Sequence, residues 1–285
     1  MESDMIWLAK TFKNSYEIVQ ALKQDTALPP LQLQDGSVLF HWCKDWADSS
    51  EIRLRGINLF ILEVFQEIFR HQIYVKDHFY QPEPSHVVFD VGAHLGFFPV
   101  YCHNLAPGIQ IHCFEPIESM HDCIEKNAAM NQIDLKIHPY AVWDKAERLE
   151  MKKSPFSASL FDQLFDATAP AMHPDIEHSF SVHTDTEFVS CISLAEAIQV
   201  ANVNHVDLLK LHVEGAEVEI VASTPAEVWQ KIDRVTVFCH EFFRPGCIEQ
   251  IADVLKNQGF SQIVTESIPE IPIASVAMIR AAKLR

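Results

Sequence analysis

From about residue 86 onward, short apolar runs alternate along the chain with stretches of helical spacing. The apolar runs are VVFDVG, IQIHCFEP, DLKIHPYAVW, VDLLKLHVEG and RVTVFCHEF, and helical patterns include one from Ser119 and one over residues 245–258. Apolar strands that alternate with helices are typical of a parallel sheet covered on both faces. The last two runs, FSQIVTES and ASVAMIRA, are separated only by a proline-containing loop, so we expect them to pair antiparallel. The pattern therefore predicts an α/β fold.

The first 80 residues have a different pattern. Helical spacing over residues 7–22 ends at a Pro29-Pro30 break, and the alternating run LQLQDGSVLFHW around an Asp35-Gly36 turn predicts a hairpin. Apolar positions with the spacing of one helical face then indicate a second helix: Ile57, Phe60, Ile61, Val64, Phe65 and Ile68.

We expect residues 1–80 to form a helical N-terminal cap and residues 81–285 the main domain. Within the main domain, residues 154–187 are polar, interrupted by prolines and too long for an ordinary connection between the strands predicted at 149–152 and 188–192. This insertion is a candidate lid over a bound substrate. The apolar faces of the cap helices would pack on the same chain or on a second copy, which leaves a homodimer through the cap open.

The net charge narrows the choice of partners. Lysine and arginine number 22 against 39 aspartates and glutamates, which gives a formal charge of −17. A chain so acidic repels nucleic-acid phosphates and anionic membranes, so we expect neither as a partner. No apolar stretch has signal length near the N-terminus or reaches the roughly 20 residues of a membrane-spanning helix. The seven cysteines include no C-x-x-C pair, which is typical of reduced thiols in a cytoplasmic protein.

A glycine turn, FDVGAHLGFF at residues 89–98, lies between a predicted strand and a predicted helix. In open parallel sheets, ligands bind outside the carboxyl ends of the strands, where such turns lie. Gly92 and Gly96 would let the backbone approach a ligand closely. His94, inside the turn, would either contact a cofactor or acceptor or be a polar loop residue.

An acidic residue ends the next strand, in the sequence CFEP. The carboxylate of Glu115 is placed to accept hydrogen bonds from both hydroxyls of a ribose. A dinucleotide dehydrogenase would have G-x-G-x-x-G in the first turn, which this chain lacks. Asp90 would repel a pyrophosphate but suits a ligand with a sulfonium and an amino group. These features favour S-adenosylmethionine and leave a nicotinamide cofactor as a distant alternative.

Four segments together resemble the FkbM family of S-adenosylmethionine-dependent methyltransferases: FDVGAHLGFF, CFEP, AVWD at residues 141–144 and DLLKLHVEGAE at residues 207–217. The resemblance extends over about residues 65–280. It implies a Rossmann-like class I methyltransferase fold, with a mostly parallel seven-stranded sheet whose final strand is antiparallel. It also implies O-methylation of a hydroxyl on a natural product or sugar.

The resemblance further implies cofactor roles for named residues. Asp90, Gly92 and Gly96 would hold the methionine part of the cofactor. Glu115 would bind the ribose, and Val142 and Asp144 would hold the adenine. The segment HVEGAE matches the family signature after the fourth strand through Glu214, Gly215 and Glu217.

The chain departs from the family at His212, where members typically have an aspartate. Histidine has an ordinary pKa of about 6.5, which suits removal of a proton from an alcohol. His212 would be that base, with Glu214 orienting it or touching the acceptor, or it would merely pack beside the cofactor.

The following strand ends in CHEF, which adds His240 and Glu241 to the same edge of the sheet. Successive strand residues point to opposite faces, so we expect only one of them, His240, to face the substrate. His212, Glu214 and His240 are the predicted catalytic residues. A divalent metal on these three is conceivable, but no spacing motif favours it.

We expect O-methylation of a small-molecule acceptor. Transfer to nitrogen or to a carboxylate would need little base catalysis, and a cofactor-binding scaffold without activity also stays open.

Overall fold

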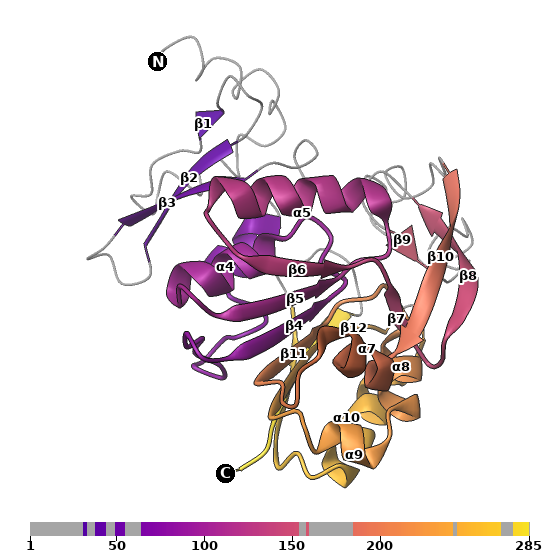
Figure 1. Ribbon diagram of the computed structural model, residues 1–285. Coiled ribbons are helices and arrows are strands. Elements are labelled where there is room, and N and C mark those ends of the chain that lie inside the picture. The colour runs from indigo at the N-terminus through magenta and orange to yellow at the C-terminus, as the bar shows by residue number, and fades with distance from the viewer. Residues whose placement is uncertain are drawn as a thin grey trace.

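The computed structural model describes residues 31–32, 38–43, 49–54, 64–153, 158–159, 185–241, 244–268 and 276–284. Its centre is a seven-stranded sheet with the order β13-β14-β12-β11-β4-β5-β6 (Figure 1). The strands are β4 (Val87–Val91), β5 (Gln110–Phe114), β6 (Leu135–His138), β11 (Leu208–Leu211), β12 (Arg234–His240), β13 (Gln262–Ser267) and β14 (Val276–Ala282).

Only β14 interrupts the parallel arrangement of this sheet. It pairs antiparallel with both β12 and β13, whereas the other neighbouring strands pair in parallel. The predicted fold class, a mostly parallel seven-stranded sheet with an antiparallel final strand, is therefore confirmed. Because β4, β5, β11 and β12 run in the same direction, their carboxyl ends meet at one edge of the sheet.

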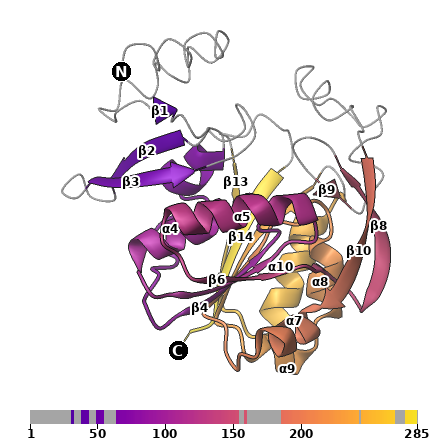
Figure 2. The ribbon, with the colours of Figure 1, turned by 45° about the horizontal axis from the view of Figure 1, so that its top comes forward.

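Helices cover both faces of the sheet (Figures 1 and 2). One face carries α4 (Phe97–Leu105) and α5 (Glu118–Met130), and the other carries α7 (Leu194–Ala201), α8 (Glu217–Ser223), α9 (Ala226–Trp229) and α10 (Cys247–Asn257). The helix expected from Ser119 thus begins at Glu118, and the one expected over residues 245–258 is α10.

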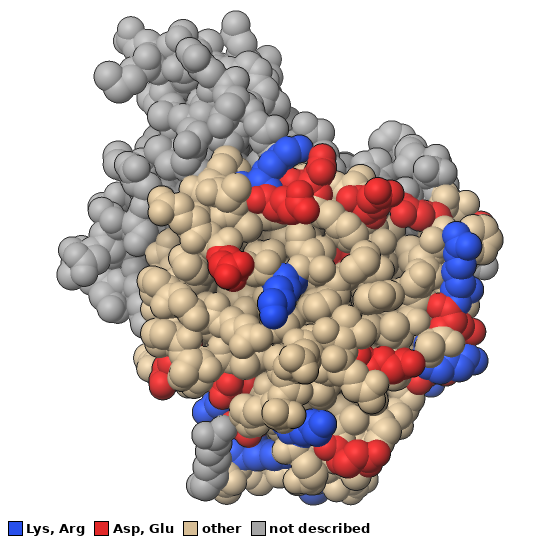
Figure 3. Space-filling view, viewed as in Figure 1, with Lys and Arg blue, Asp and Glu red and all other residues tan. Residues whose placement is uncertain are grey.

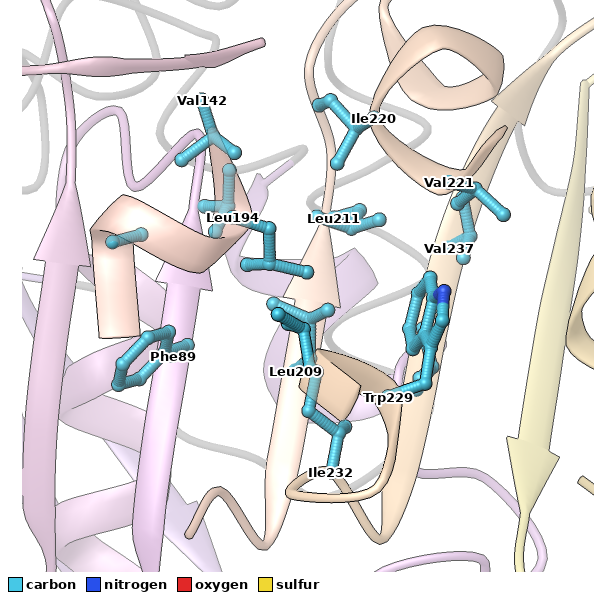
Figure 4. Packing of buried hydrophobic residues seen from close by; sticks show 14 of the residues in the cluster. Phe89, Val142, Leu194, Leu209, Leu211, Ile220, Val221, Trp229, Ile232 and Val237 are labelled. Carbon is cyan, nitrogen blue, oxygen red and sulfur yellow. The ribbon is translucent and has the colours of Figure 1, made fainter. Parts of the chain in front are cut away.

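Strand side chains alternate between two hydrophobic cores. Val88 and Leu208 lie in the core beneath α4 and α5, whereas their neighbours Phe89 and Leu209 lie in the core beneath α7 to α10. Figure 4 shows the second core, in which Trp229 is completely buried. Each fully buried valine, leucine, isoleucine or phenylalanine side chain in these cores contributes about 1.5–3 kcal/mol. The two cores hold the sheet, and hence the positions of its strand ends.

A second sheet has the order β7-β10-β8-β9. It consists of β7 (Ala141–Trp143), β8 (Glu147–Lys153), β9 (Ala158–Ser159) and β10 (Asp185–Ser193). The strands predicted at residues 149–152 and 188–192 are confirmed as parts of β8 and β10, although their antiparallel pairing was not predicted. Most of the predicted lid, residues 154–187, lies outside the described residues.

Three short strands are described before residue 64. β1 (Leu31–Gln32) pairs antiparallel with β2 (Val38–Cys43), as the predicted hairpin requires, and β2 also pairs with an unpredicted strand, β3 (Ser49–Leu54). The helix expected over residues 7–22 and most of the next one lie outside the described residues. The last predicted positions of the latter fall in the helical turn η1 (Gln66–Arg70), where Phe69 packs edge-on against Tyr101 of α4. From Phe65 onward, the chain therefore belongs to the main core.

In the part of the chain that the structure describes, no helix is both long enough and apolar enough to span a membrane. On the face drawn in Figure 3, acidic and basic side chains are scattered over a largely uncharged surface.

Candidate active site

The three predicted catalytic residues come together at the carboxyl edge of the central sheet. His212 and Glu214 follow β11, and His240 is the last residue of β12. Nε2 of His212 lies 3.4 Å from Oε1 of Glu214, and Nε2 of His240 lies 3.3 Å from Oε2 of the same carboxylate. The Glu214 carboxylate thus lies between the two imidazole rings.

Each imidazole is held from its other side. The hydroxyl of Tyr74 lies 2.7 Å from Nδ1 of His212, and Oε1 of Glu217 lies 2.7 Å from Nδ1 of His240. The His212 ring also stacks on Phe238 with parallel planes and centroids 4.2 Å apart. These contacts fix both rings with Nε2 directed at Glu214.

Sequence reasoning missed Tyr74, which lies in the segment expected to be a cap. It is separated from His212 by 138 positions, and no local pattern indicates contact over that distance. Glu217 was noticed only as part of the family signature.

Burial and the neighbouring charges set the ionisation of the cluster. Burial lowers the pKa of His212 despite the attraction of Glu214. Burial would also lower the pKa of His240, but the carboxylates of Glu214 and Glu217 raise it to about 10. Burial would raise the pKa of Glu214, yet His240 and His212 hold it well below its ordinary value. The free cluster thus holds a charged His240, a charged Glu214 and a neutral His212 at neutral pH.

The backbone at Glu214 is in an unusual conformation. Its φ is 53°, in the left-handed region, and Gly215 follows at 104°. A residue other than glycine in this region costs of order 1–3 kcal/mol, and such strain concentrates at ligand-binding sites. Glu214 is therefore held in place by the surrounding structure.

The glycine turn contacts the β11 end of the cluster directly. Gly92, His94 and Gly96 all have φ between 50° and 76°. A Cβ atom on Gly92 would lie 1.9 Å from the backbone oxygen of His212, so only glycine is accommodated there. Burial lowers the pKa of His94 to about 4, which keeps its imidazole neutral.

A buried ion pair supports this turn. Nζ of Lys210 donates to Oδ1 of Asp90 at 2.7 Å and to the backbone oxygen of Gly92 at 2.8 Å. Lys210 was missed, although a lysine within the apolar run DLLKL is a signal for a buried charged partner, and the strand register places it beside Asp90. Asp90 thus holds the turn, and its predicted contact with the cofactor stays a prediction.

The other predicted cofactor residues come from β5 of the central sheet and from β7 of the second sheet. Glu115 follows β5, and its two carboxylate oxygens accept hydrogen bonds from the backbone N–H groups of His94, at 2.8 Å, and Ile117, at 3.0 Å. A carboxylate has further lone pairs, so ribose hydroxyls can still bind. Val142 is buried in β7 against the core beneath α7.

Asp144 carries a buried acceptor that suits an adenine. Its Oδ1 atom has no hydrogen-bond partner among the described residues. An exocyclic amino group would satisfy this oxygen, because a buried acceptor without a donor is costly. The residues that follow β4, β5 and β7 therefore fit a nucleoside cofactor.

Known proteins that are similar to this chain are methyltransferases. Residues 90–261 match the family described as methyltransferase FkbM domain. The chain is 26% identical over 221 residues to 31-O-demethyl-FK506 methyltransferase FkbM of Streptomyces tacrolimicus, covering 72% of this chain and 84% of that protein. It is 25% identical over 210 residues to Methyltransferase 1 of Beauveria bassiana, covering 70% and 81%. A solved structure of methyltransferase FkbM from Methylobacillus flagellatus KT aligns with a TM-score of 0.48 and 10% identity, over 79% of this chain and 56% of that one.

Proposed function

We propose that this chain, which belongs to the FkbM methyltransferase family, transfers the methyl group of S-adenosylmethionine to a hydroxyl oxygen of a small molecule. One observation carries the proposal: the glycine turn after β4 lies against the backbone of His212, so the predicted cofactor site adjoins the cluster of His212, Glu214 and His240. The cofactor would therefore be bound next to groups that can handle a proton.

The residues at the strand ends divide the binding of the cofactor among them. The glycine turn would receive the methionine part, Glu115 the ribose hydroxyls and Asp144 the adenine amino group. S-adenosylmethionine, when bound, supplies a methyl group on a positively charged sulfur that leaves as a neutral thioether.

The cluster would remove the proton of the acceptor hydroxyl. As the hydroxyl oxygen bonds to the methyl carbon, the carbon–sulfur bond breaks and its electron pair stays on sulfur. His212 is neutral because burial lowers its pKa. A neutral imidazole at His212 can accept the proton, and the Glu214 carboxylate, 3.4 Å from its Nε2 atom, would stabilise the resulting imidazolium.

Two facts favour oxygen as the acceptor atom. The Streptomyces relative is named as a methyltransferase of 31-O-demethyl-FK506, a compound that lacks a methyl group on an oxygen. In addition, an alcohol requires removal of a proton, whereas a neutral amine is nucleophilic without a base, and this chain holds a neutral imidazole at the site.

The test uses acceptors in matched sets. Alcohols, amines and carboxylic acids on the same carbon skeletons are incubated with the protein and S-adenosylmethionine carrying an isotopically labelled methyl group, and labelled products are detected by mass. We expect products from alcohols, and a loss of about 10²–10⁴-fold in rate for His212→Ala. Methylation of the amines alone, at a rate that His212→Ala does not change, would overturn the oxygen assignment.

A further inference from the structure

The atoms of His212, Glu214 and His240 that face one another are all potential metal ligands. One such atom from each residue lies within 4.8 Å of those from the other two. We propose that these three side chains bind a divalent transition-metal ion of the zinc type. The proposal goes beyond methyl transfer, since it assigns an ion to residues whose spacing in the sequence does not predict one.

The distances agree with a shared ion. Two ligand atoms that each lie about 2.1 Å from a tetrahedrally coordinated ion are about 3.4 Å apart. Oε1 of Glu214 lies 3.4 Å from Nε2 of His212, and its Oε2 lies 3.3 Å from Nε2 of His240, so each imidazole has one carboxylate oxygen at this spacing.

The partners of the two histidines are those that metal-binding histidines require. A ligating imidazole normally donates its second N–H to a carboxylate, a backbone carbonyl or a water, which fixes the ring and the tautomer. A phenol oxygen can accept such a hydrogen bond as well. Nδ1 of His240 lies 2.7 Å from Glu217, and Nδ1 of His212 lies 2.7 Å from the Tyr74 hydroxyl. When the Nδ1 atoms carry the protons and a metal ion displaces any proton on Nε2, both Nε2 atoms would face the Glu214 carboxylate with a lone pair.

The ligand atoms indicate which ions would bind. Two imidazole nitrogens and one carboxylate suit zinc, cobalt, iron or manganese, whereas magnesium and calcium prefer oxygen ligands. The His212 and Glu214 side chains are 22% and 24% exposed, and His240 is 4% exposed. The site is therefore anchored in the protein on one side and open on the other, as sites with three protein ligands and an exchangeable position are.

A role for the ion in catalysis rests on the proposed function. An acceptor oxygen bound at the exchangeable position would have a lower pKa, because the ion attracts electron density from it. With an ion bound, the Nε2 atom of His212 would be a ligand and could not accept a proton. The ion would instead promote loss of the proton by lowering the pKa of the acceptor hydroxyl.

A second cluster in the described residues provides a control. His205, Asp207 and Asp233 also bring potential ligand atoms within 4.8 Å of one another. They lie at the amino-terminal edge of the sheet, His205 is 40% exposed, and the Asp207 carboxylate already accepts the backbone N–H of Val87. We expect this cluster to be a surface ion network.

The experiment is a metal titration of the purified full chain after treatment with a chelator. Zinc binding is followed by calorimetry, cobalt binding by its visible absorption spectrum, and magnesium serves as the comparison ion. We expect one zinc or cobalt ion per chain and no comparable affinity for magnesium. His212→Ala should abolish this binding, Glu217→Gln should weaken it by about 10–100-fold through loss of the partner of His240, and His205→Ala should leave it unchanged.

Thermal unfolding of each metal-free variant shows whether it is folded, and Tyr74→Phe replaces Glu217→Gln should the latter fail to fold. The proposal is overturned if the wild-type chain binds neither zinc nor cobalt, or if His212→Ala binds them as tightly as the wild type does. S-adenosylmethionine is titrated separately into the metal-free chain. If the chain binds the cofactor but no metal ion, only the metal proposal is rejected. If it binds a metal ion but no cofactor, only the proposed function is rejected.

Discussion

Gly92 determines how closely the glycine turn and the β11 end of the cluster approach each other. Its φ of +76° already disfavours other residues, and an added Cβ would lie 1.9 Å from the backbone oxygen of His212. We expect Gly92→Ala to push these two segments apart and to abolish cofactor binding. It should also lower the free energy of unfolding by more than about 1–2 kcal/mol, which is the cost of placing alanine in a left-handed backbone conformation without any clash. Urea unfolding and calorimetric titration measure the two effects.

Gly259 provides a matched control for the backbone conformation. Its φ is +90°, but nothing lies within 4 Å of the position that a Cβ would occupy. Gly259→Ala should therefore lower the free energy of unfolding only by the cost of the left-handed backbone conformation, and it should leave cofactor binding intact. Equal losses of stability in the two variants would contradict the close contact at Gly92.

The buried ion pair of Asp90 and Lys210 should contribute to the stability of the fold. Lys210→Met leaves the Asp90 carboxylate buried without its cation, which should lower the free energy of unfolding by about 3–5 kcal/mol. Adding Asp90→Asn removes the uncompensated charge, so the double variant should be more stable than Lys210→Met alone. Chemical denaturation of the three variants tests this, and strictly additive losses would show that the pair is not coupled.

Among elements, α10 begins with a cap supplied from the preceding strand end. The carboxylate of Glu241 accepts hydrogen bonds from the backbone N–H groups of Gly246 and of Ile248, the latter at 3.2 Å. Glu241→Ala should therefore lower the free energy of unfolding by about 1 kcal/mol, as loss of a helix cap does. The affinity for S-adenosylmethionine should not change, and a lower affinity would place Glu241 in the site instead.

The adjacent strands β5 and β6 make the fold sensitive to acid. Nδ1 of His112 lies 2.9 Å from Nε2 of His138, and burial, together with His138 and Lys136, lowers the pKa of His112 from 6.5 to about 4. The unfolded chain therefore binds a proton at His112 at a higher pH than the folded chain does. The free energy of unfolding should fall by about 3 kcal/mol as the pH drops from 6.5 to 4, with no such contribution above that range.

His112→Gln removes this titration. Carboxylates also titrate in the same range, so the measurement compares the pH dependence of urea unfolding between the variant and the wild type. The wild type should lose stability more steeply toward pH 4, and parallel curves would contradict the assignment.

The elements themselves were largely predictable from the sequence, because apolar runs and helical spacing are local. All seven central strands follow predicted runs, and the antiparallel pair of β13 and β14 follows from the absence of a crossover between them. The pairing of β10 with β7 and with β8 was not predictable, since residues 154–184 separate β10 from both strands along the chain.

At the scale of the whole molecule, the sequence indicated which edge of the sheet carries the site but not the contacts that complete it. His212, Glu214 and His240 could be placed together because parallel strand ends meet at one edge. Tyr74 could not, since its role depends on a contact between residues 138 positions apart. The run DLLKL signals that Lys210 is buried with a partner, but not that this partner is Asp90, 120 positions away. The partners that fix the orientation of a site are thus the least visible part of it in a single sequence.

The central claim is that the carboxyl edge of the sheet binds S-adenosylmethionine beside the histidine cluster. The most direct test is calorimetric titration of the purified chain with S-adenosylmethionine, repeated with Glu115→Gln. We predict saturable binding of one molecule per chain, weakened about tenfold or more by Glu115→Gln, because a charged acceptor for the ribose hydroxyls is lost. Absence of binding by a folded wild-type chain, or binding that Glu115→Gln does not weaken, would contradict the claim.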